Sequence, residues 1–396
     1  MKLSVVVPAY NEERSLSRCI ERVLAIADEN LELEILIVDD ASTDATGAIA
    51  RGLADQHPQI RVLYHDVNQG KGAALQTGFR QVTGDVVAVQ DADLEYDPRE
   101  LRYLLEPFRA DMADVVIGSR FLSGGARRVL YFWHSVGNKL LTLLSNAFTD
   151  LNLTDMETCY KLFRLDVLQR IELHEQRFGF EPEIVAHIAR MRLRIYEMGI
   201  SYSGRTYAEG KKIGIKDGFR ALYCIFRYNM PHAPLPIQFA TYVPIGGVCA
   251  AANALCFLAL LRVASVPVAA GTAFIAAAAL NYWLSTAVLF RRQARWSTWT
   301  ELAAYAAVVG AVACIDVLST MAFLAAGLAP ALAKLLASSA ALAFNFAGRR
   351  LIVFPEPRPA DWASADRLAV LHSDARADAG SLRSTPPVAE PSRSVH

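Results

Sequence analysis

The sequence predicts an α/β domain with a mainly parallel sheet, followed by an all-α membrane domain of four helices. Two observations predict this architecture. From residue 1 to about 120, short β-branched runs alternate with segments of helix length, which favours a parallel sheet covered by helices. Further along, residues 236–348 contain only seven of the 80 Asp, Glu, Lys and Arg residues of the chain. Such a charge-poor stretch is typical of helices that lie in lipid.

The strands of the predicted sheet end at positions rich in polar side chains. We expect strands at residues 3–8, 34–40, 60–65, 84–93 and 113–120. Polar or acidic residues stand at 10–13, 39–44 and 91–95, where three of these strands end. Ligands of open α/β sheets bind outside the carboxyl ends of the strands, so this edge is the candidate site.

Four apolar stretches follow, at about 238–261, 263–290, 302–325 and 328–348. Each is long enough to cross a bilayer as a helix. Basic residues precede the first stretch, separate the second from the third and follow the fourth: Arg220, Arg227, Arg291, Arg292, Arg295, Arg349 and Arg350. By the positive-inside rule, both termini are cytoplasmic, in an inner or plasma membrane. Residues 281–290 and 345–354 resemble each other at an offset of 64, which indicates two related helical hairpins.

These patterns divide the chain into three parts. Residues 1–235 form the α/β domain, 236–354 the membrane domain, and 355–396, rich in Pro and Ser, a disordered tail. The apolar run before Pro8 is too short for a signal peptide. Residues 127–148 combine arginines with aromatic side chains, a composition typical of a helix at the bilayer surface, although an ordinary packed helix has the same pattern.

Overall composition excludes two classes of protein. Hydrophobic residues make up 53% of the chain and the mean hydropathy is +0.23, which excludes a disordered protein. The formal net charge is zero, so no global basic excess points to nucleic acid. Any attraction to phosphate must therefore be local.

Asp91-Ala92-Asp93 closes a hydrophobic strand, and Glu95 follows two residues later. Paired carboxylates at such a place suit Mg²⁺ or Mn²⁺, with a diphosphate completing the coordination. The same residues are also compatible with a solvated acidic loop that caps the helix expected near residue 98. The location at the edge of the sheet favours the metal site.

Three residues at the ends of the first two strands could contact a nucleotide. Tyr10 could stack on a flat base, Glu12 could accept hydrogen bonds from sugar or base, and Asp40 could pair with an N–H edge of the base. Asn11 and Glu12 are also compatible with a helix start, and Asp40 is equally well explained as a helix cap. The glycine-rich segment 68–72 lacks the spacing of a P-loop or a dinucleotide fingerprint, so we reject both of those assignments.

Basic side chains are available to neutralise a diphosphate. Arg120 ends a predicted strand, and Arg205 and Lys211 lie on a glycine-containing loop that could close over phosphate oxygens. Taken alone, lysines such as Lys211 and Lys212 are more often surface residues or contacts to anionic lipid.

Six ordered motifs resemble the family-2 glycosyltransferases of GT-A fold: VVVPAYNEE, VDDASTD, NQGKGAAL, DADLEYDP, GSRF and the spacing of Arg205 and Lys211. Within that family the sequence is most similar to dolichyl-phosphate mannose synthases and bacterial polyprenyl-phosphate glycosyltransferases. The resemblance covers roughly residues 1–230, and residues 236–354 resemble the four-helix GtrA-type domain.

The resemblance implies a role for particular residues. Around the nucleotide it places Pro8, Tyr10, Glu12, Val38 and Asp40. The metal and diphosphate would be held by Asp91, Ala92, Asp93 and Glu95, and the donor contacted by Arg120, Arg205 and Lys211. Asp155 matches a catalytic acidic position near the sugar or acceptor. Glu95 stands where several relatives have Gln, and Tyr160 where Gly or Phe-type residues are usual, so neither the metal nor the sugar is assigned.

The implied reaction is inverting transfer of a hexose, mannose or glucose, from a nucleotide diphosphate sugar to a polyprenyl (dolichyl or undecaprenyl) phosphate. Two alternatives stay open. One is a processive polysaccharide synthase, against which stands the absence of an intact Q-x-x-R-W motif. The other is a protein that anchors or translocates lipid-linked sugar, with a first domain that only binds nucleotide.

Overall fold

The computed structural model describes residues 1–122, 128–129, 131–206, 214–260, 262–290 and 298–354. The expected tail at 355–396 and the expected donor contact Lys211 lie outside these residues. Residues Met1–Pro357 form one compact unit. The domain boundary expected at 235/236 therefore stays a prediction.

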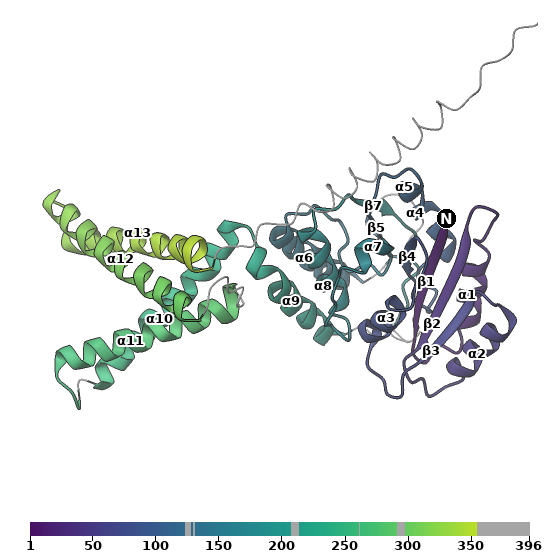
Figure 1. The fold of residues 1–396 in the computed structure, drawn as a ribbon, viewed down its shortest axis with the longest axis horizontal. Helices are drawn as coiled ribbons and strands as arrows, with labels where there is room; N and C mark the ends of the chain where they lie inside the picture. The colour runs from purple at the N-terminus through teal and green to yellow at the C-terminus, as the bar shows by residue number, and fades with distance from the viewer. Residues whose placement is uncertain (123–127, 130, 207–213, 261, 291–297, 355–396) are drawn as a thin grey trace, which may run out of the picture. The chain divides into compact units, whose positions relative to one another are not determined.

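The N-terminal part is built on a seven-stranded sheet with the order β3-β2-β1-β4-β6-β5-β7 (Figure 1). The strands are β1 (Lys2–Ala9), β2 (Glu32–Asp39), β3 (Ile60–Tyr64), β4 (Val86–Val89), β5 (Val115–Ser119), β6 (Lys161–Arg164) and β7 (Ile195–Gly199). All neighbouring pairs are parallel except those that involve β6, which runs antiparallel to both β4 and β5. The predicted mainly parallel α/β fold is thus confirmed.

The five strands expected from the sequence are β1 to β5. The central residues of β1, β2, β4 and β5 are mostly apolar and buried because helices cover both faces of a parallel sheet, so runs of Val and Ile make these strands recognisable. The edge strand β3 is only partly buried. The sequence analysis did not find β6 and β7. Both strands are short, and neither sequence, KLFR for β6 or IYEMG for β7, contains a long apolar run. Strand β7 is also only partly buried.

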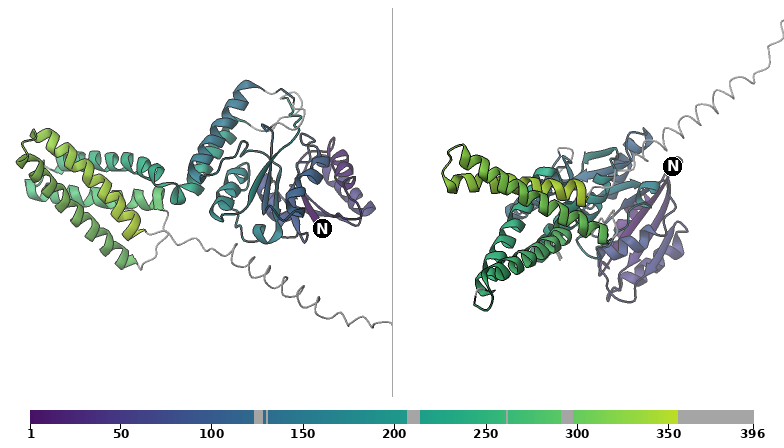
Figure 2. Two further views of the ribbon diagram at one scale, coloured as in Figure 1. Left: turned by 90° about the horizontal axis from the view of Figure 1, so that it is seen from above. Right: turned by 60° about the vertical axis from the view of Figure 1, so that its left-hand side comes forward.

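Helices connect and cover the strands. In the sheet region they are α1 (Leu16–Leu24), α2 (Thr46–Gln56), α3 (Lys71–Phe79), η1 (Pro98–Glu100), α4 (Leu101–Leu104), α5 (Glu106–Arg109) and α7 (Leu165–Leu168). Beyond the sheet are α6 (Phe132–Thr149), α8 (Phe180–Arg190), α9 (Ile215–Asn229) and η3 (Met230–His232). Helix α3 packs on β1 and β2, whereas α6, α8 and α9 pack on one another (Figures 1 and 2).

The loops that follow β1, β2 and β4 are held together at one edge of the sheet. The backbone N–H of Asn11 donates to Ser42 Oγ at 3.0 Å, and its side-chain oxygen accepts from the N–H of Thr43 at 2.8 Å. Asn11, Ala41 and Leu94 all have positive φ, a strained conformation for residues other than glycine. Strain of this kind is often concentrated at functional sites, where surrounding contacts hold it in place.

The C-terminal part consists of two helical hairpins. Their helices are α10 (Leu235–Leu260), α11 (Val266–Leu284), α12 (Thr298–Ala325) and α13 (Pro330–Gly348), and π-helical turns η4 (Ser285–Phe290) and η5 (Arg349–Val353) extend α11 and α13. Within the described residues, three segments are long and apolar enough to cross a membrane: Leu235–Leu260, Gly271–Phe290 and Trp299–Ala325. The fourth expected span is present as helix α13, whose sequence includes Lys334 and Asn345. Helix α13 is not one of these three apolar segments. The number of membrane crossings therefore stays a prediction.

The repeat expected at an offset of 64 is visible in this part. Both π-helical turns begin four residues after an asparagine, Asn281 or Asn345, and the rings of Phe290 and Phe354 stack at 4.7 Å. Arg349 joins the two hairpins: its guanidinium is buried, donates to Asn281, Ser285 and Tyr305, and lies 4.7 Å from the centre of the Tyr305 ring.

The packing of α3 on the sheet gives a test of the fold. A Cβ on Gly78 would lie 2.4 Å from a Val6 methyl group, whereas a Cβ on Gly52, in α2, would meet nothing within 4 Å. We expect Gly78→Ala to destabilise the protein by about 1–3 kcal/mol through overpacking. Gly52→Ala should stabilise it by up to about 1 kcal/mol, because alanine favours helix. Thermal unfolding of the full chain in detergent measures both, and a Gly78→Ala variant as stable as wild type would contradict this packing.

Candidate active site

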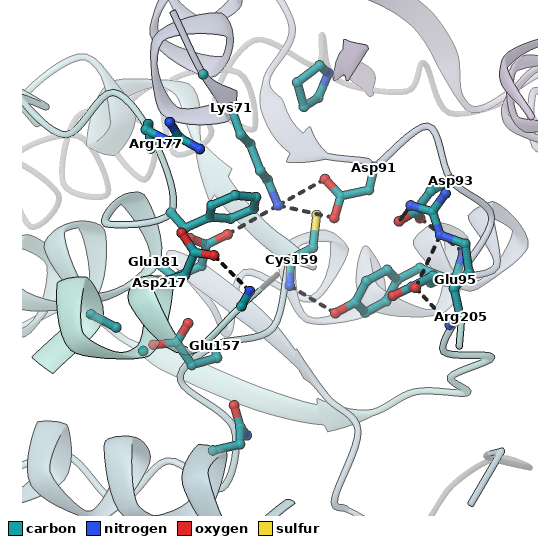
Figure 3. A pocket seen from close by; sticks show the side chains of 18 of the residues that line it. Lys71, Asp91, Asp93, Glu95, Glu157, Cys159, Arg177, Glu181, Arg205 and Asp217 are labelled. Carbon is teal, nitrogen blue, oxygen red and sulfur yellow. Dashed lines mark hydrogen bonds and ion pairs between the residues drawn. The ribbon is translucent and has the colours of Figure 1, made fainter. Parts of the chain in front are cut away.

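A cavity of about 750 Å³ lies at the carboxyl ends of the central strands (Figure 3). Ten residues expected in the site line it: Pro8, Tyr10, Glu12, Asp40, Asp91, Ala92, Asp93, Glu95, Arg120 and Arg205. Two others do not line it. Val38 is part of the buried core of β2, and Asp155 is fully buried beside Arg120.

Asp91 is paired with a lysine that the sequence analysis did not assign. Lys71 Nζ, at the start of α3, lies 2.9 Å and 3.1 Å from the two carboxylate oxygens of Asp91, and 3.1 Å from Glu181 Oε1. Burial alone would lower the pKa of Lys71, but the two carboxylates outweigh it and the pKa is raised well above its usual value. Lys71 is therefore a permanent cation in the wall of the cavity.

Asp93 is paired with Arg205. The guanidinium lies 2.7 Å from Asp93 Oδ2 and 3.4 Å from Glu12 Oε2. Burial, together with the negative charges of Asp91 and Glu95, raises the pKa of Asp93 to about 7. More negative charge is thus gathered here than Arg205 alone neutralises.

Glu95 holds Arg205 in place. One of its carboxylate oxygens accepts from the hydroxyl of Tyr202 at 2.6 Å, and the other accepts from the backbone N–H of Arg205 at 2.8 Å. The sequence analysis expected Glu95 to be a metal ligand together with Asp91 and Asp93. In the part of the chain that the structure describes, no three Asp, Glu, His or Cys side chains are grouped as a metal site requires.

The side-chain oxygens of Asp91 and Asp93 nevertheless suit a divalent cation as ligands. Both side chains offer carboxylate oxygens, which Mg²⁺ and Mn²⁺ prefer, at the end of one strand. The raised pKa of Asp93 reflects a negative charge that a bound cation would relieve. The metal assignment of Asp91 and Asp93 stays a proposal, with Glu95 engaged by Tyr202 and Arg205.

Arg120 is fixed by a buried carboxylate. Its Nε and Nη2 each donate to Asp155 at 2.7 Å, and its backbone N–H donates to the same carboxylate at 3.0 Å. Asn138, from α6, donates to Asp155 at 3.1 Å. Burial alone would raise the pKa of Asp155, but Arg120 holds it below the usual value. Asp155 is therefore a positioning residue for Arg120, and Arg120 is the group that faces the cavity.

Asp40 builds the loop that leads into α3. Its carboxylate accepts from the backbone N–H groups of Gln69 and Gly70 at 2.9 Å and 2.7 Å, and it lies 2.7 Å from a ring nitrogen of His65. Gly70 has a φ of +99°, and a Cβ there would lie 2.6 Å from the carbonyl oxygen of Gln176. The predicted role of Asp40 in base recognition stays a prediction, and its present contacts place Lys71 in the cavity.

The sequence analysis missed Lys71, Glu157 and Glu181, all of which line the cavity (Figure 3). Glu181 lies in the first turn of α8, and Glu157 lies just before β6. One signal was available for Lys71, because it follows a glycine at the start of a helix, and it was set aside when the P-loop pattern failed. The segments 154–164 and 178–183, which contain Glu157 and Glu181, look motif-like in the sequence, but periodicity gives them no role. Only the fold brings these segments to the cavity.

Comparisons with known proteins identify the families that this chain resembles. The model of the family "Glycosyl transferase family 2" matches residues 4–172, and that of "GtrA/DPMS, transmembrane domain" matches residues 241–354. The undecaprenyl-phosphate mannosyltransferase of Micrococcus luteus is 34% identical over 226 residues, which are 54% of this chain and 88% of that protein. The dolichol-phosphate mannosyltransferase of Pyrococcus furiosus is 30% identical over 229 residues, 57% of this chain and 63% of that protein.

A solved structure is also similar. Glucosyl-3-phosphoglycerate synthase from Mycobacterium tuberculosis, crystallised with Mn²⁺, uridine diphosphate and glucosyl-3-phosphoglycerate, aligns at 19% identity with a TM-score of 0.46. The alignment covers 58% of this chain and 80% of that one.

The chain belongs to glycosyl transferase family 2 and is a glycosyltransferase. It is a membrane protein whose C-terminal part matches the GtrA/DPMS transmembrane domain. The expectations of a GT-A-type fold, a glycosyltransferase and a GtrA-like domain are confirmed.

The buried pair of Arg120 and Asp155 gives a test of the site. In Asp155→Asn, Arg120 loses its counterion within the protein, and removal of one partner of a buried ion pair typically costs 3–5 kcal/mol. We expect a clearly lower melting temperature for this variant. The control Asp150→Asn changes an exposed aspartate five residues away and should shift stability by less than about 0.5 kcal/mol. Equal melting temperatures for the two variants would contradict the assigned role of Asp155.

Proposed function

We propose that the protein transfers a hexose, mannose or glucose, from a nucleotide diphosphate sugar to a polyprenyl phosphate, with inversion at the anomeric carbon. The observation that carries this proposal is the Asp91–Asp93 pair, balanced by Lys71 and Arg205, in a cavity at the sheet edge. The polyprenyl-phosphate sugar transferases that the chain resembles support the choice of acceptor.

The donor nucleotide would bind at the ends of β1 and β2. Tyr10 lines the cavity with 37% of its surface exposed, and its ring would stack on the base of the donor. Arg205 and the Asp91–Asp93 pair lie next to it in the cavity lining, where the diphosphate would be held. Lys211, outside the described residues, remains a proposed second cation for the diphosphate.

A divalent cation, Mg²⁺ or Mn²⁺, bound by Asp91 and Asp93 would neutralise charge on the departing nucleoside diphosphate. The residues of the chain perform the other tasks. Arg205 supplies charge-assisted hydrogen bonds, and Glu95 and Glu12 hold its guanidinium against the carboxylates. Arg120, fixed by Asp155, lines the cavity and would contact the acceptor phosphate.

The acceptor would reach the cavity along α6 and α9, which lie side by side (Figures 1 and 2). Large aromatic side chains on these helices are exposed: Phe132 by 69%, Trp133 by 77% and Phe219 by 69%. Exposed aromatic residues of this kind suit a bilayer surface. Trp133 and Asn138 also line the cavity, so α6 connects an apolar surface with the candidate site.

The acceptor itself needs little activation. A phosphate monoester has a second pKa of about 6, so it is largely a dianion at neutral pH. A strong general base is then unnecessary. The chain has to hold the phosphate oxygen in line with the anomeric carbon, and binding in a fixed geometry can lower the barrier of such a reaction by several kcal/mol.

The arrangement in the membrane is also part of the proposal. We propose four spans in an inner or plasma membrane, with the catalytic domain and both termini cytoplasmic and the domains bounded at residues 1–235, 236–354 and 355–396. Positively charged flanks of the apolar stretches support this orientation. The two related hairpins favour translocation of the lipid-linked product as a second candidate function of the membrane part.

Asp93→Ala tests the proposed reaction. It should lower transfer of radiolabelled hexose to polyprenyl phosphate by a hundredfold or more, because an essential charge contact is lost. Chelation of divalent cations should have a similar effect on wild type, and added Mn²⁺ or Mg²⁺ should restore it. Asp66→Ala, an exposed carboxylate outside the cavity, serves as the control. Transfer at the full wild-type rate by Asp93→Ala with the metal present would reject the role of Asp93.

A further inference from the structure

One corner of the cavity holds two glutamates that the proposed reaction does not use. Glu157 and Glu181 lie on the same side of the cavity, away from Asp93 and Arg205 (Figure 3). They come from the segment before β6 and from the first turn of α8. Neither is a surface residue, and Glu181 is only 4% exposed.

Each of these glutamates has an oxygen without a partner. Glu157 Oε1 and Glu181 Oε2 are buried, and no hydrogen-bond donor of the described residues reaches them. Buried polar atoms in folded proteins nearly always have a partner, and leaving one unsatisfied is costly. Two such atoms in residues that line one cavity indicate that a ligand supplies the missing hydrogen-bond partners.

The nearby lysine cannot fill this role. Lys71 Nζ already contacts both oxygens of Asp91 and Glu181 Oε1, which uses the three hydrogens of an ammonium group. Lys161 Nζ donates instead to the backbone carbonyl groups of Met156 and Thr158. Burial, together with the charge of Glu181, raises the pKa of Glu157 to about 8, so its carboxyl group is largely protonated at neutral pH and can donate as well as accept a hydrogen bond.

The charge of the corner limits what can bind there. A diphosphate or a lipid phosphate would be repelled by Glu181 and Asp91, which share the single positive charge of Lys71. A second metal ion would have to approach the ammonium group of Lys71, which lies between Asp91 and Glu181. An uncharged group with several hydroxyl donors meets neither obstacle, and the transferred sugar is the part of the proposed substrates that has this chemistry.

We propose that Glu157 and Glu181 form the subsite that recognises the hydroxyl groups of the transferred sugar, and that the donor is an uncharged, fully hydroxylated hexose and not an acidic sugar. This inference rests on the proposed function for the identity of the ligand. A site that hydrogen-bonds a substrate hydroxyl discriminates strongly against the analogue that lacks it, because its own polar groups are then left unpaired.

A binding cycle tests the subsite without any requirement for catalysis. The nucleotide hexose that the full-length protein binds most tightly is identified first. Its dissociation constant is then compared by calorimetry with those of its four monodeoxy analogues, its uronate analogue and the free nucleoside diphosphate. The same measurements are made on Glu157→Gln, Glu181→Gln and the control Glu172→Gln, an exposed glutamate outside the cavity.

We expect at least one deoxy analogue to bind wild type tenfold or more weakly than the hexose, and this difference to fall below about threefold in Glu157→Gln or Glu181→Gln. The uronate should also bind wild type at least tenfold more weakly, and less so in the variants. The free nucleoside diphosphate should bind all four proteins within about twofold.

Three results would overturn the inference: the same deoxy penalties in all four proteins, uronate binding as tight as hexose binding in wild type, or a parallel loss of nucleoside diphosphate affinity in the variants. Melting temperatures of the variants separate a binding effect from misfolding. Failure of the proposed transfer to polyprenyl phosphate would be seen in the lipid assay alone and would leave this binding cycle interpretable.

Discussion

The site depends on the balance of buried charges at the sheet edge. Asp91 and Asp93 stand one residue apart at the end of β4, where burial and the charges of Asp91 and Glu95 raise the pKa of Asp93. Lys71, from the start of α3, and Arg205, from the segment after β7, each neutralise one of them. An anionic donor can enter such a cavity only with further positive charge, which is why a divalent cation is a consistent part of the account.

This balance also explains why so much of the surrounding structure serves to hold two cations. Asp40 fixes the loop that leads to Lys71, and Glu95 fixes the backbone and side chain of Arg205. Carboxylates that look alike in the sequence therefore have different tasks. Some face the cavity, whereas others position the groups that do.

Local sequence patterns predicted the parts of the fold that have a period of their own. The five apolar strands and the long apolar helices are of this kind, as are the acidic residues at strand ends, because topology brings those ends to one edge. Strands β6 and β7 could not be found, since antiparallel insertion of β6 between β4 and β5 is decided by tertiary pairing. The ion-pair partners of buried charges could not be predicted either. Nothing near Asp155 in the sequence indicates that it would hold Arg120, 35 residues away.

In the membrane domain, too, some features can be predicted from the sequence and others cannot. The 64-residue repeat is readable from the sequence, but the two π-helical turns and the side chain that joins the hairpins are not. Arg349 is buried among neutral partners, Asn281, Ser285 and Tyr305, so its position is fixed by hydrogen bonds and aromatic contacts. Only the packed structure reveals that one arginine of a basic pair is internal.

The most direct measurement of the central claim is the affinity of the full-length protein for nucleoside diphosphate as a function of Mn²⁺ concentration. If Asp91 and Asp93 hold a cation that completes the charge balance for the donor, the two ligands must bind cooperatively, and each must tighten the binding of the other by the same factor. The account predicts an affinity that rises at least tenfold as Mn²⁺ saturates. An affinity that is independent of Mn²⁺ would contradict it.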